Sequence, residues 1–268
     1  MTIDTQLALD GLATVDLATV LEVAPLARRT DRKYLVPTAD AARLVESLAD
    51  SHRILEIEGR RCTSYRSTYF DTAELRLCRD HLQGRRLRWK ARSRLYVEDR
   101  LCRFEVKVKG DRGETVKCSV DVDADAYGRL GPDELAFLAE ALGERRTEAG
   151  RLHPTLEVGY SRATLVDLVE GTRLTFDHGV VGRPTPTAPT ALRPGAVSLD
   201  LDHVIVETKS GPRPGQGDRV LAAMGHRPLA LSKYTTSAAL LATGVADNHV
   251  RRLVGRGVTV RHDLGRAS

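Results

Sequence analysis

Alternation of polar and apolar residues is the strongest pattern in this chain, and it dominates the stretch from residue 62 to residue 122. Turn signals interrupt it at Gly84 and between Gly110 and Gly113. Successive side chains of a β-strand point to opposite faces, so a period of two predicts consecutive antiparallel strands here. The same signal returns over residues 154–166, 172–178 and 197–209.

A helical period marks other segments of the chain. Apolar residues recur at helical spacing across residues 37–52, and Thr38 is the expected N-cap of that helix. Prolines between residues 183 and 195 predict an irregular connection. Three further helices are predicted, over residues 131–144, near residues 217–225 and near residues 232–243.

The predicted strands carry basic side chains on one face and apolar side chains on the other. The first such row consists of Arg86, Arg88, Lys90, Arg92 and Arg94. The next two strands repeat the pattern with Arg103, Glu105, Lys107 and Lys109, and then with Thr115, Lys117 and Ser119. Shorter polar rows are formed by Arg29, Asp31 and Lys33, by Arg173, Thr175 and Asp177, and by Glu207 and Lys209.

So many like charges on neighbouring strands would repel one another unless an anion or interleaved carboxylates offset them. We therefore favour an anion-binding face over the alternative, a sandwich whose basic face is solvated. The few carboxylates in these rows are either metal ligands or salt-bridge partners. For Asp31 and Asp177 we favour the salt bridge.

The fold predicted from these patterns is α+β, a closed antiparallel β-barrel tunnel with a polar interior, covered by a few helices. At 268 residues the chain is long enough for one substantial core. We expect an N-terminal arm at 1–24, one tunnel domain at 25–245 and a basic C-terminal tail at 246–268.

Overall composition narrows the class of protein only slightly. Lys and Arg number 41 against 36 Asp and Glu, a formal charge of +5 that permits an acidic partner. No apolar run reaches the roughly 18 residues of a membrane span, and the N-terminus lacks a basic region followed by an apolar stretch. We expect a cytoplasmic protein. Neither glycine-rich stretch, at residues 110–114 and 211–217, matches a P-loop, so side chains must bind any phosphates.

A series of short motifs follows in a specific order along the chain. They are R-x-x-x-K-Y from Arg29, Y-F-D-T from Tyr69, R-L-R-W from Arg86, F-E-V-K from Phe104, V-K at Val116, Y-S-R from Tyr160, V-E-T-K from Val206 and S-K-Y from Ser232. This succession resembles the catalytic domain of the vacuolar transporter chaperone (VTC) polyphosphate polymerases and their bacterial relatives. Those proteins belong to the CYTH-like triphosphate tunnel metalloenzymes, and the resemblance spans roughly residues 25 to 243.

The resemblance implies an ATP-dependent polyphosphate polymerase that transfers the γ-phosphate of ATP to a growing polyphosphate chain inside a basic tunnel. ATP, ADP and inorganic polyphosphate are the implied partners, and Mn²⁺ or Mg²⁺ is the implied cofactor. Carried over by motif, the catalytic residues are Arg86, Arg88, Lys107 and Arg162. The phosphate-binding residues are Arg29, Lys33, Arg79, Lys117, Lys209 and Lys233, and the metal ligand is Glu207.

Three features depart from the expected pattern. The related hydrolases open with E-x-E-x-K, whereas this chain has Arg29, Asp31 and Lys33, which favours the polymerases. Ala230 stands where the polymerases carry a lysine. Arg162 shares its parity with apolar positions before it, a conflict that a β-bulge would resolve.

Other functions stay open. A hydrolase could use the same residues to cleave triphosphate or short polyphosphate, and a non-catalytic module could bind polyphosphate or inositol phosphates. Nucleic acid is disfavoured, because aromatic residues make up 4% of the chain and provide few stacking platforms. The direction of the reaction, the preferred metal, the oligomeric state and a membrane-bound partner protein are all left open by the sequence.

Overall fold

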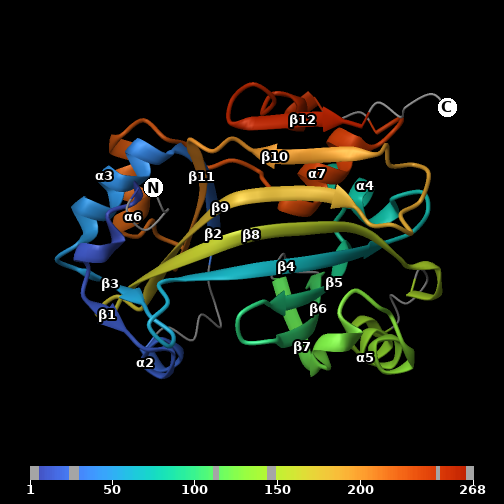
Figure 1. The fold of residues 1–268 in the computed structure, drawn as a ribbon, viewed down its shortest axis with the longest axis horizontal. Helices are drawn as coiled ribbons and strands as arrows, with labels where there is room; N and C mark the ends of the chain where they lie inside the picture. Colours follow the sequence, from blue (N-terminus) through green and yellow to red (C-terminus); the bar gives the residue numbers. More distant parts are fainter. Residues whose placement is uncertain (1–5, 24–29, 111–114, 144–148, 246–247, 264–268) are drawn as a thin grey trace. The chain divides into compact units, whose positions relative to one another are not determined.

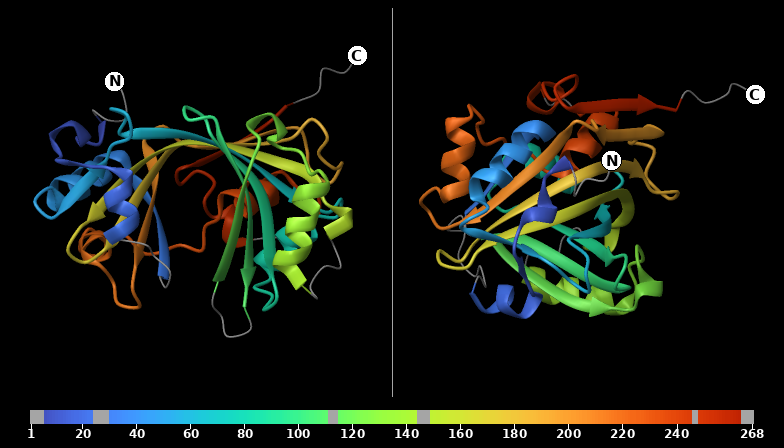
Figure 2. Two further views of the ribbon diagram at one scale, coloured as in Figure 1. Left: turned by 90° about the horizontal axis from the view of Figure 1, so that it is seen from below. Right: turned by 60° about the vertical axis from the view of Figure 1, so that its left-hand side comes forward.

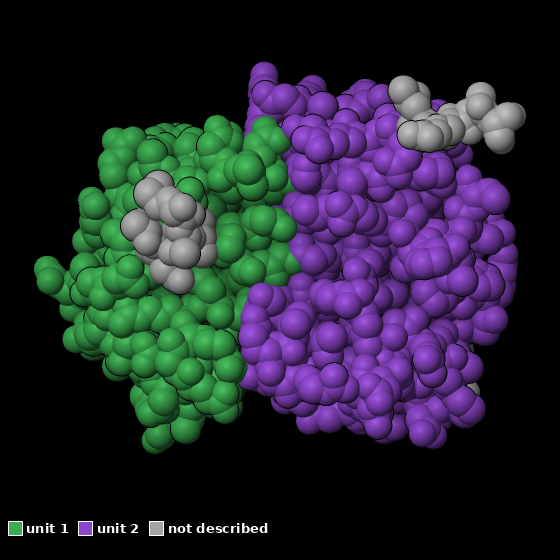
Figure 3. All heavy atoms as spheres, viewed as in Figure 1, with its two compact units in different colours: residues 1–63, 160–179, 199–231 green, residues 64–159, 180–198, 232–268 purple. Residues whose placement is uncertain are grey.

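The computed structural model describes residues 6–23, 30–110, 115–143, 149–245 and 248–263. These residues form seven α-helices and a mainly antiparallel sheet of 12 strands, which confirms the α+β class (Figure 1). The chain divides into two compact units (Figure 3). Unit 1 comprises residues 1–63, 160–179 and 199–231, and unit 2 comprises residues 64–159, 180–198 and 232–268.

Unit 1 is built around strand β11, which pairs with β2 on one side and β9 on the other. These strands are β2 (Thr30–Pro37), β9 (Thr172–Pro184) and β11 (His203–Ser210). The helices α3 (Thr38–Leu48) and α6 (Gln216–Ala223) pack together beside them (Figure 1). Phe176, Val204 and Val206 belong to the buried core of this unit. The alternate residues of the same strands therefore form a separate, polar face.

The remaining elements of unit 1 come from the N-terminal part of the chain. Its elements are η1 (Leu9–Gly11), β1 (Thr14–Val15), α2 (Leu17–Val23) and β3 (His52–Leu55). Strand β3 pairs with β1 and with the end of β8 (His153–Asp167). Val15, Val20 and Val166 form a small apolar cluster there.

Unit 2 contains four consecutive antiparallel strands. They are β4 (Cys62–Asp71), β5 (Trp89–Tyr96), β6 (Leu101–Lys109) and β7 (Thr115–Val122). The 3-10 helix η2 (Ala124–Ala126) follows β7, and α5 (Pro132–Leu142) packs against β6 (Figure 2). Phe104, Val106 and Leu138 are fully buried between them. The basic rows of these strands consequently lie on the face that α5 does not cover.

The other elements of unit 2 follow the long strands. They are α4 (Arg76–Leu82), β10 (Gly195–Leu199), α7 (Lys233–Leu241), α8 (Asn248–Arg251) and β12 (Val258–His262). Helices α4 and α7 are in contact, and β12 lies next to β10 in the sheet. Part of the segment expected as a C-terminal tail is therefore folded into α8 and β12.

Several predicted elements have different ends in the structure. The N-cap of α3 is Pro37, and Thr38 is the first helical residue, so the predicted cap was wrong by one position. Strand β9 extends through Pro184 into the segment predicted to be irregular. The strand predicted at residues 197–209 is divided into β10 and β11 by a turn.

A closed barrel is not confirmed. Along the described strands the pairing runs from β12 to β7, and β7 pairs with β6 while β2 pairs with β11. Within the described residues these pairings leave the sheet open. In the same residues, no helix combines the length and the apolar character that crossing a membrane requires.

Candidate functional site

The polar face of unit 1 centres on a buried ion pair. Arg162 of β8 donates to Asp177 of β9 through Nε at 2.5 Å and Nη2 at 2.8 Å. The Asp177 side chain is fully buried, so its charge depends on Arg162 for compensation. The Arg162 guanidinium also lies 5.4 Å from the ring centre of Tyr160. The salt bridge predicted for Asp177 is confirmed.

Glu207 of β11 forms ion pairs with the two cations beside it. Its carboxylate lies 3.5 Å from Lys209 Nζ and 3.8 Å from Arg162 Nη2, which are ion-pair distances longer than a direct hydrogen bond. Burial lowers the pKa of Lys209 to about 8, although the nearby Glu207 carboxylate opposes that shift. An added anion would favour the charged form of this lysine.

The neighbouring strand β2 extends the same face. Lys33 pairs in register with Glu207, and Asp31 pairs in register with Lys209. Opposed residues in adjacent strands have side chains about 5 Å apart at Cβ. Two lysines and two acidic residues thus alternate across β2 and β11. The structure therefore brings together Lys33, Arg162, Glu207 and Lys209, all predicted from sequence.

The polar face of unit 2 carries three lysines side by side. Lys90 of β5 pairs in register with Lys107 of β6, which pairs in turn with Lys117 of β7. Like charges directly opposite one another destabilise a sheet. A bound polyanion would remove that cost, because phosphate oxygens would replace water around the ammonium groups.

Glu105 is the buried carboxylate beneath this basic face. Its side chain is fully buried and contacts Arg92 Nε at 2.5 Å, forms an ion pair with Lys117, and lies 3.8 Å from Arg94. Burial would raise the pKa of Glu105, but the charges of Arg92, Arg94 and Lys117 together hold it far below its usual range. One carboxylate thus orients three cations.

Replacing Glu105 by Gln is expected to lower the free energy of unfolding by about 2 kcal/mol at pH 7, because three buried or half-buried cations lose their counter-charge. The folded-state pKa lies below the unfolded value, so this stabilisation is present above pH 4.5 and is lost as the pH falls further. Urea titrations should show a smaller difference in the free energy of unfolding between wild type and variant at pH 3.5 than at pH 7. A difference in the free energy of unfolding that is the same at both pH values would contradict the stabilising role of the Glu105 charge.

The Y-F-D-T and S-K-Y motifs form one structural unit that positions Lys233. Asp71 is fully buried and accepts hydrogen bonds from the backbone of Leu77 and Cys78, each at 2.8 Å, and from the Tyr234 hydroxyl. The rings of Tyr69 and Tyr234 stack with centroids 4.8 Å apart. These contacts fix the start of α7.

Lys233, the first residue of α7, is thereby held near the basic face of β4 and β5. Ser232 caps the helix by accepting from Thr235 N. Arg92 donates to the Tyr69 hydroxyl at 2.9 Å. Burial raises the pKa of Tyr69, but Arg92 and Arg94, with a smaller effect from Lys233, lower it overall. Lys233 is therefore close enough to contribute to the positive field on this face.

Other predicted residues are placed less centrally. Arg86 is exposed in the connection before β5, and Arg88 is half-buried there, donating to Arg85 O at 2.6 Å. The predicted row of five cations is consequently reduced on β5 to Lys90, Arg92 and Arg94. Arg79 lies on α4 and donates to Glu74 O at 2.9 Å. Arg29 lies outside the described residues.

Sequence reasoning gave no role to several residues of these faces. Arg92 and Arg94 appeared only as part of a row, and Tyr69 only as part of a motif, whereas the structure joins them to Glu105. Alternation also holds from Arg162 onward, with Ala163 and Leu165 in the core. Val158 and Tyr160 before Arg162 are buried at the opposite parity to these two residues, so the buried face changes near Arg162 and the bulge stays a prediction.

Lysine is used on these faces in a selective way. The chain contains seven lysines, against 34 arginines among its 41 basic residues. The lysines are Lys33 and Lys209 of unit 1, Lys90, Lys107, Lys109 and Lys117 of unit 2, and Lys233 at the start of α7. Every lysine thus lies on a polar strand face or beside one, while arginine provides the positive charge elsewhere.

Glu207 fits a divalent metal better than Asp177 does. Mg²⁺ and similar cations are held by one or two carboxylates together with phosphate oxygens and water. Asp177 makes a two-point contact with Arg162, whereas the ion pairs of Glu207 with Arg162 and Lys209 span 3.8 and 3.5 Å. Glu207 is therefore the carboxylate of this face that could hold such a cation.

A second group of metal-ligating side chains lies in the turn between β10 and β11. Ligand atoms of Asp200, Asp202 and His203 lie within 4.8 Å of one another. His203 Nδ1 and Asp202 Oδ1 are 2.8 Å apart, so a hydrogen bond accounts for part of this proximity. We assign no metal to this turn.

Comparison with known proteins identifies one family. A family model described as VTC domain matches residues 28–242. No curated protein matches the chain.

Solved structures with a related arrangement share little sequence with the chain. The Hippeastrum protein HpAC1, for which a dominant triphosphatase activity is described, has 16% identity and a TM-score of 0.47, with 83% of this chain and 100% of that chain covered. A candidate adenylate cyclase from Bacillus halodurans has 15% identity and a TM-score of 0.45, with 84% and 96% covered. We base no argument on these likenesses.

Proposed function

Because the chain belongs to the VTC domain family, we propose that it is an ATP-dependent polyphosphate polymerase. It transfers the γ-phosphate of ATP to a growing chain of inorganic phosphate and releases ADP. The family and the basic faces support an enzyme that acts on polyphosphate or triphosphate. We further propose that its reaction is polymer synthesis. In this proposal the polymer occupies a basic tunnel, as the resemblance implies.

The placement of lysine is the observation that carries the proposal. Arginine binds phosphate through a rigid planar fork, whereas lysine offers a compact charge on a flexible stem. A polymer that advances by one unit per cycle requires contacts that are strong in total but easily exchanged. Lys90 and Lys107 provide such contacts, while Arg92, Arg94 and Lys117 are anchored by Glu105.

Phosphoryl transfer depends chiefly on positioning and charge stabilisation. A terminal oxygen of the polymer attacks the γ-phosphorus of ATP, the bond to the β-phosphate oxygen breaks, and ADP leaves with that electron pair. Arg162 and Lys209 provide positive charge beside Glu207. When bound at Glu207, Mn²⁺ or Mg²⁺ would supply further charge neutralisation for the phosphate oxygens.

Incubation of the purified protein with ATP and Mn²⁺ tests the proposal. We expect long-chain polyphosphate and ADP, and we expect Lys107→Ala to reduce the rate at least about tenfold because a stabilising charge is lost. Arg193→Ala, an exposed arginine in the same unit, is the matched control and should retain the wild-type rate. Release of orthophosphate without polymer would show a hydrolase instead, and tight binding without turnover would show a binding module.

A further inference from the structure

A proline-rich loop between β11 and α6 is fixed by one buried carboxylate. Asp218 of α6 is 3% exposed and accepts hydrogen bonds from the Tyr34 hydroxyl at 2.8 Å, the Thr208 hydroxyl at 2.5 Å and the backbone N–H of Gly215 at 2.9 Å. Arg32 donates to Pro212 O at 2.8 Å from the other side. These contacts hold the loop in place without a ligand.

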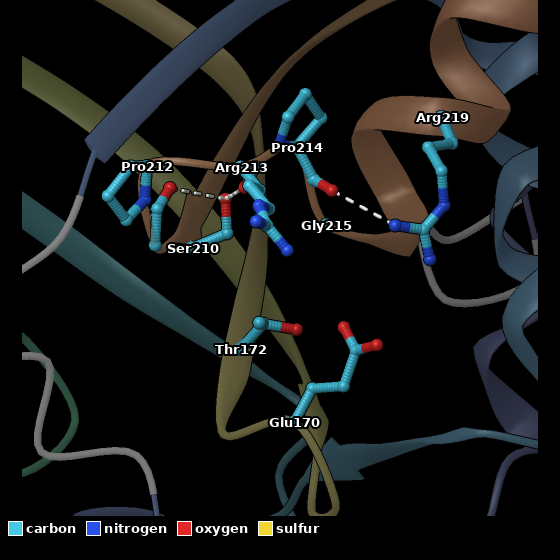
Figure 4. A pocket seen from close by; sticks show the side chains of 9 residues that line it. Glu170, Thr172, Ser210, Pro212, Arg213, Pro214, Gly215 and Arg219 are labelled. Atoms are coloured by element: carbon cyan, nitrogen blue, oxygen red, sulfur yellow. Dashed lines mark hydrogen bonds between the residues drawn. The ribbon is translucent and has the colours of Figure 1, made fainter.

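This loop forms one wall of a pocket within unit 1. The opposite wall comes from Glu170, in the connection between β8 and β9, and from Thr172, the first residue of β9, while Arg219 of α6 closes the side. The side chains of Arg213, Thr172, Glu170 and Arg219 surround the same open space (Figure 4). Pro212 and Pro214 add apolar surface.

The polar groups of the pocket are available to a ligand. Within the part of the chain that the structure describes, the Arg213 guanidinium and the Glu170 carboxylate have no hydrogen-bond or ion-pair partner. Arg219 donates to Pro214 O at 3.0 Å through one nitrogen, which leaves its other donors. The pocket thus offers two cations, one anion and the Thr172 hydroxyl, whereas the Ser210 hydroxyl is already hydrogen-bonded to Asp218.

That combination favours a ligand carrying both phosphate and hydroxyl groups. Two arginines suit phosphate oxygens. A bare polyphosphate would bring further negative charge toward Glu170, which costs energy. A ribose diol, by contrast, can donate hydrogen bonds to the Glu170 carboxylate. The prolines offer an apolar surface for the base.

Position along β11 connects this pocket to the proposed catalytic face. Ser210 lines the pocket and follows Lys209 directly, and Glu207 lies three residues before it. A strand rises about 3.3 Å per residue, so the pocket begins roughly 10 Å along β11 from Glu207. A nucleotide extended along this strand would reach both places.

We infer that this pocket binds the nucleoside end of ATP and ADP, with Glu170 accepting from the ribose hydroxyls and Arg213 and Arg219 contacting the adjacent phosphates. The inference rests on the proposed function, since it assigns the pocket to the phosphate donor. It makes Glu170 a determinant of specificity for a nucleotide over inorganic phosphates and Arg213 a contact to the phosphates.

Calorimetric titration with ADP and with pyrophosphate tests the inference, because these ligands share two phosphates and differ by the nucleoside. We expect wild type to bind ADP more tightly than pyrophosphate. Glu170→Gln should weaken ADP binding about tenfold, as loss of a charge-assisted hydrogen bond predicts, and change pyrophosphate binding less than about twofold, whereas Arg213→Gln should weaken the binding of both ligands. Arg227→Gln, an exposed arginine outside the pocket, should change neither.

Equal loss of ADP and pyrophosphate binding in Glu170→Gln would overturn the inference, and so would unchanged ADP binding in either variant. Equal affinity of wild type for both ligands would overturn it as well. The two proposals fail separately. Polymer synthesis without an ADP preference counts against the pocket alone, and an ADP preference without polymer synthesis counts against the polymerase.

Discussion

Replacement of Glu207 by Gln is expected to reduce polymer synthesis from ATP at least about a hundredfold, while binding of tripolyphosphate in the absence of metal persists. Gln keeps the shape of the side chain but removes the charge that would hold a divalent cation against the phosphates, and removal of such a stabilising contact costs two or more orders of magnitude in rate. Synthesis should be measured over a range of Mn²⁺ concentrations, and binding should be measured by calorimetry with a chelator present.

The matched control is Asp202→Asn, which removes a carboxylate from the acidic turn of the same unit. Asp202 is 81% exposed and is bonded to His203, and we expect the variant to retain the wild-type rate and Mn²⁺ dependence. Loss of Mn²⁺ dependence in Asp202→Asn, with Glu207→Gln still active, would move the metal from the strand face to the turn.

Replacement of Asp177 by Asn is expected to lower the free energy of unfolding by about 3 kcal/mol. The fully buried carboxylate makes a two-point contact with Arg162, and removing one partner leaves the other charge buried without compensation. Chemical denaturation at pH 7 measures the loss. Tripolyphosphate should raise the melting temperature more in the variant than in wild type, because phosphate oxygens would replace the missing counter-charge beside Arg162.

Asp121→Asn provides the comparison for that effect. Asp121 accepts from Arg103 at 2.8 Å, but the two side chains are 64% and 38% exposed, so we expect a loss below about 1 kcal/mol. A similar small loss in Asp177→Asn would mean that Arg162 finds other compensation. An identical gain in melting temperature for variant and wild type would show that phosphate does not reach Arg162.

Local pattern was sufficient to predict which strand faces are polar. Alternation alone placed Lys107, Glu105 and Lys117 on one side of their strands, and the structure agrees. It was not sufficient to find where a strand begins. Helix α4 ends at Leu82 and a turn through Gly84 follows, so Arg86 precedes β5 although its parity matches the row.

Contacts between distant parts of the chain explain the remaining differences between the sequence prediction and the structure. Asp71 and Tyr234 are 163 positions apart, and nothing near either residue indicates that they form a hydrogen bond. Closure of a barrel likewise depends on pairing between distant strand edges, which alternation within each strand does not encode. The strand patterns favoured a barrel with a polar interior, and the family resemblance supported the same tunnel, but neither fixes which strand edges pair.

The restriction of lysine to these faces has a chemical consequence. All seven side-chain amines of the protein lie on or beside the two polar faces. Reagents that acylate amines therefore act on those faces and on the α-amino group, and they leave the arginines of the remaining surface unmodified. Acetylation of lysine in the cell would be confined to the same side chains. It would therefore remove positive charge only on the two polar faces, where a polyanion would lie.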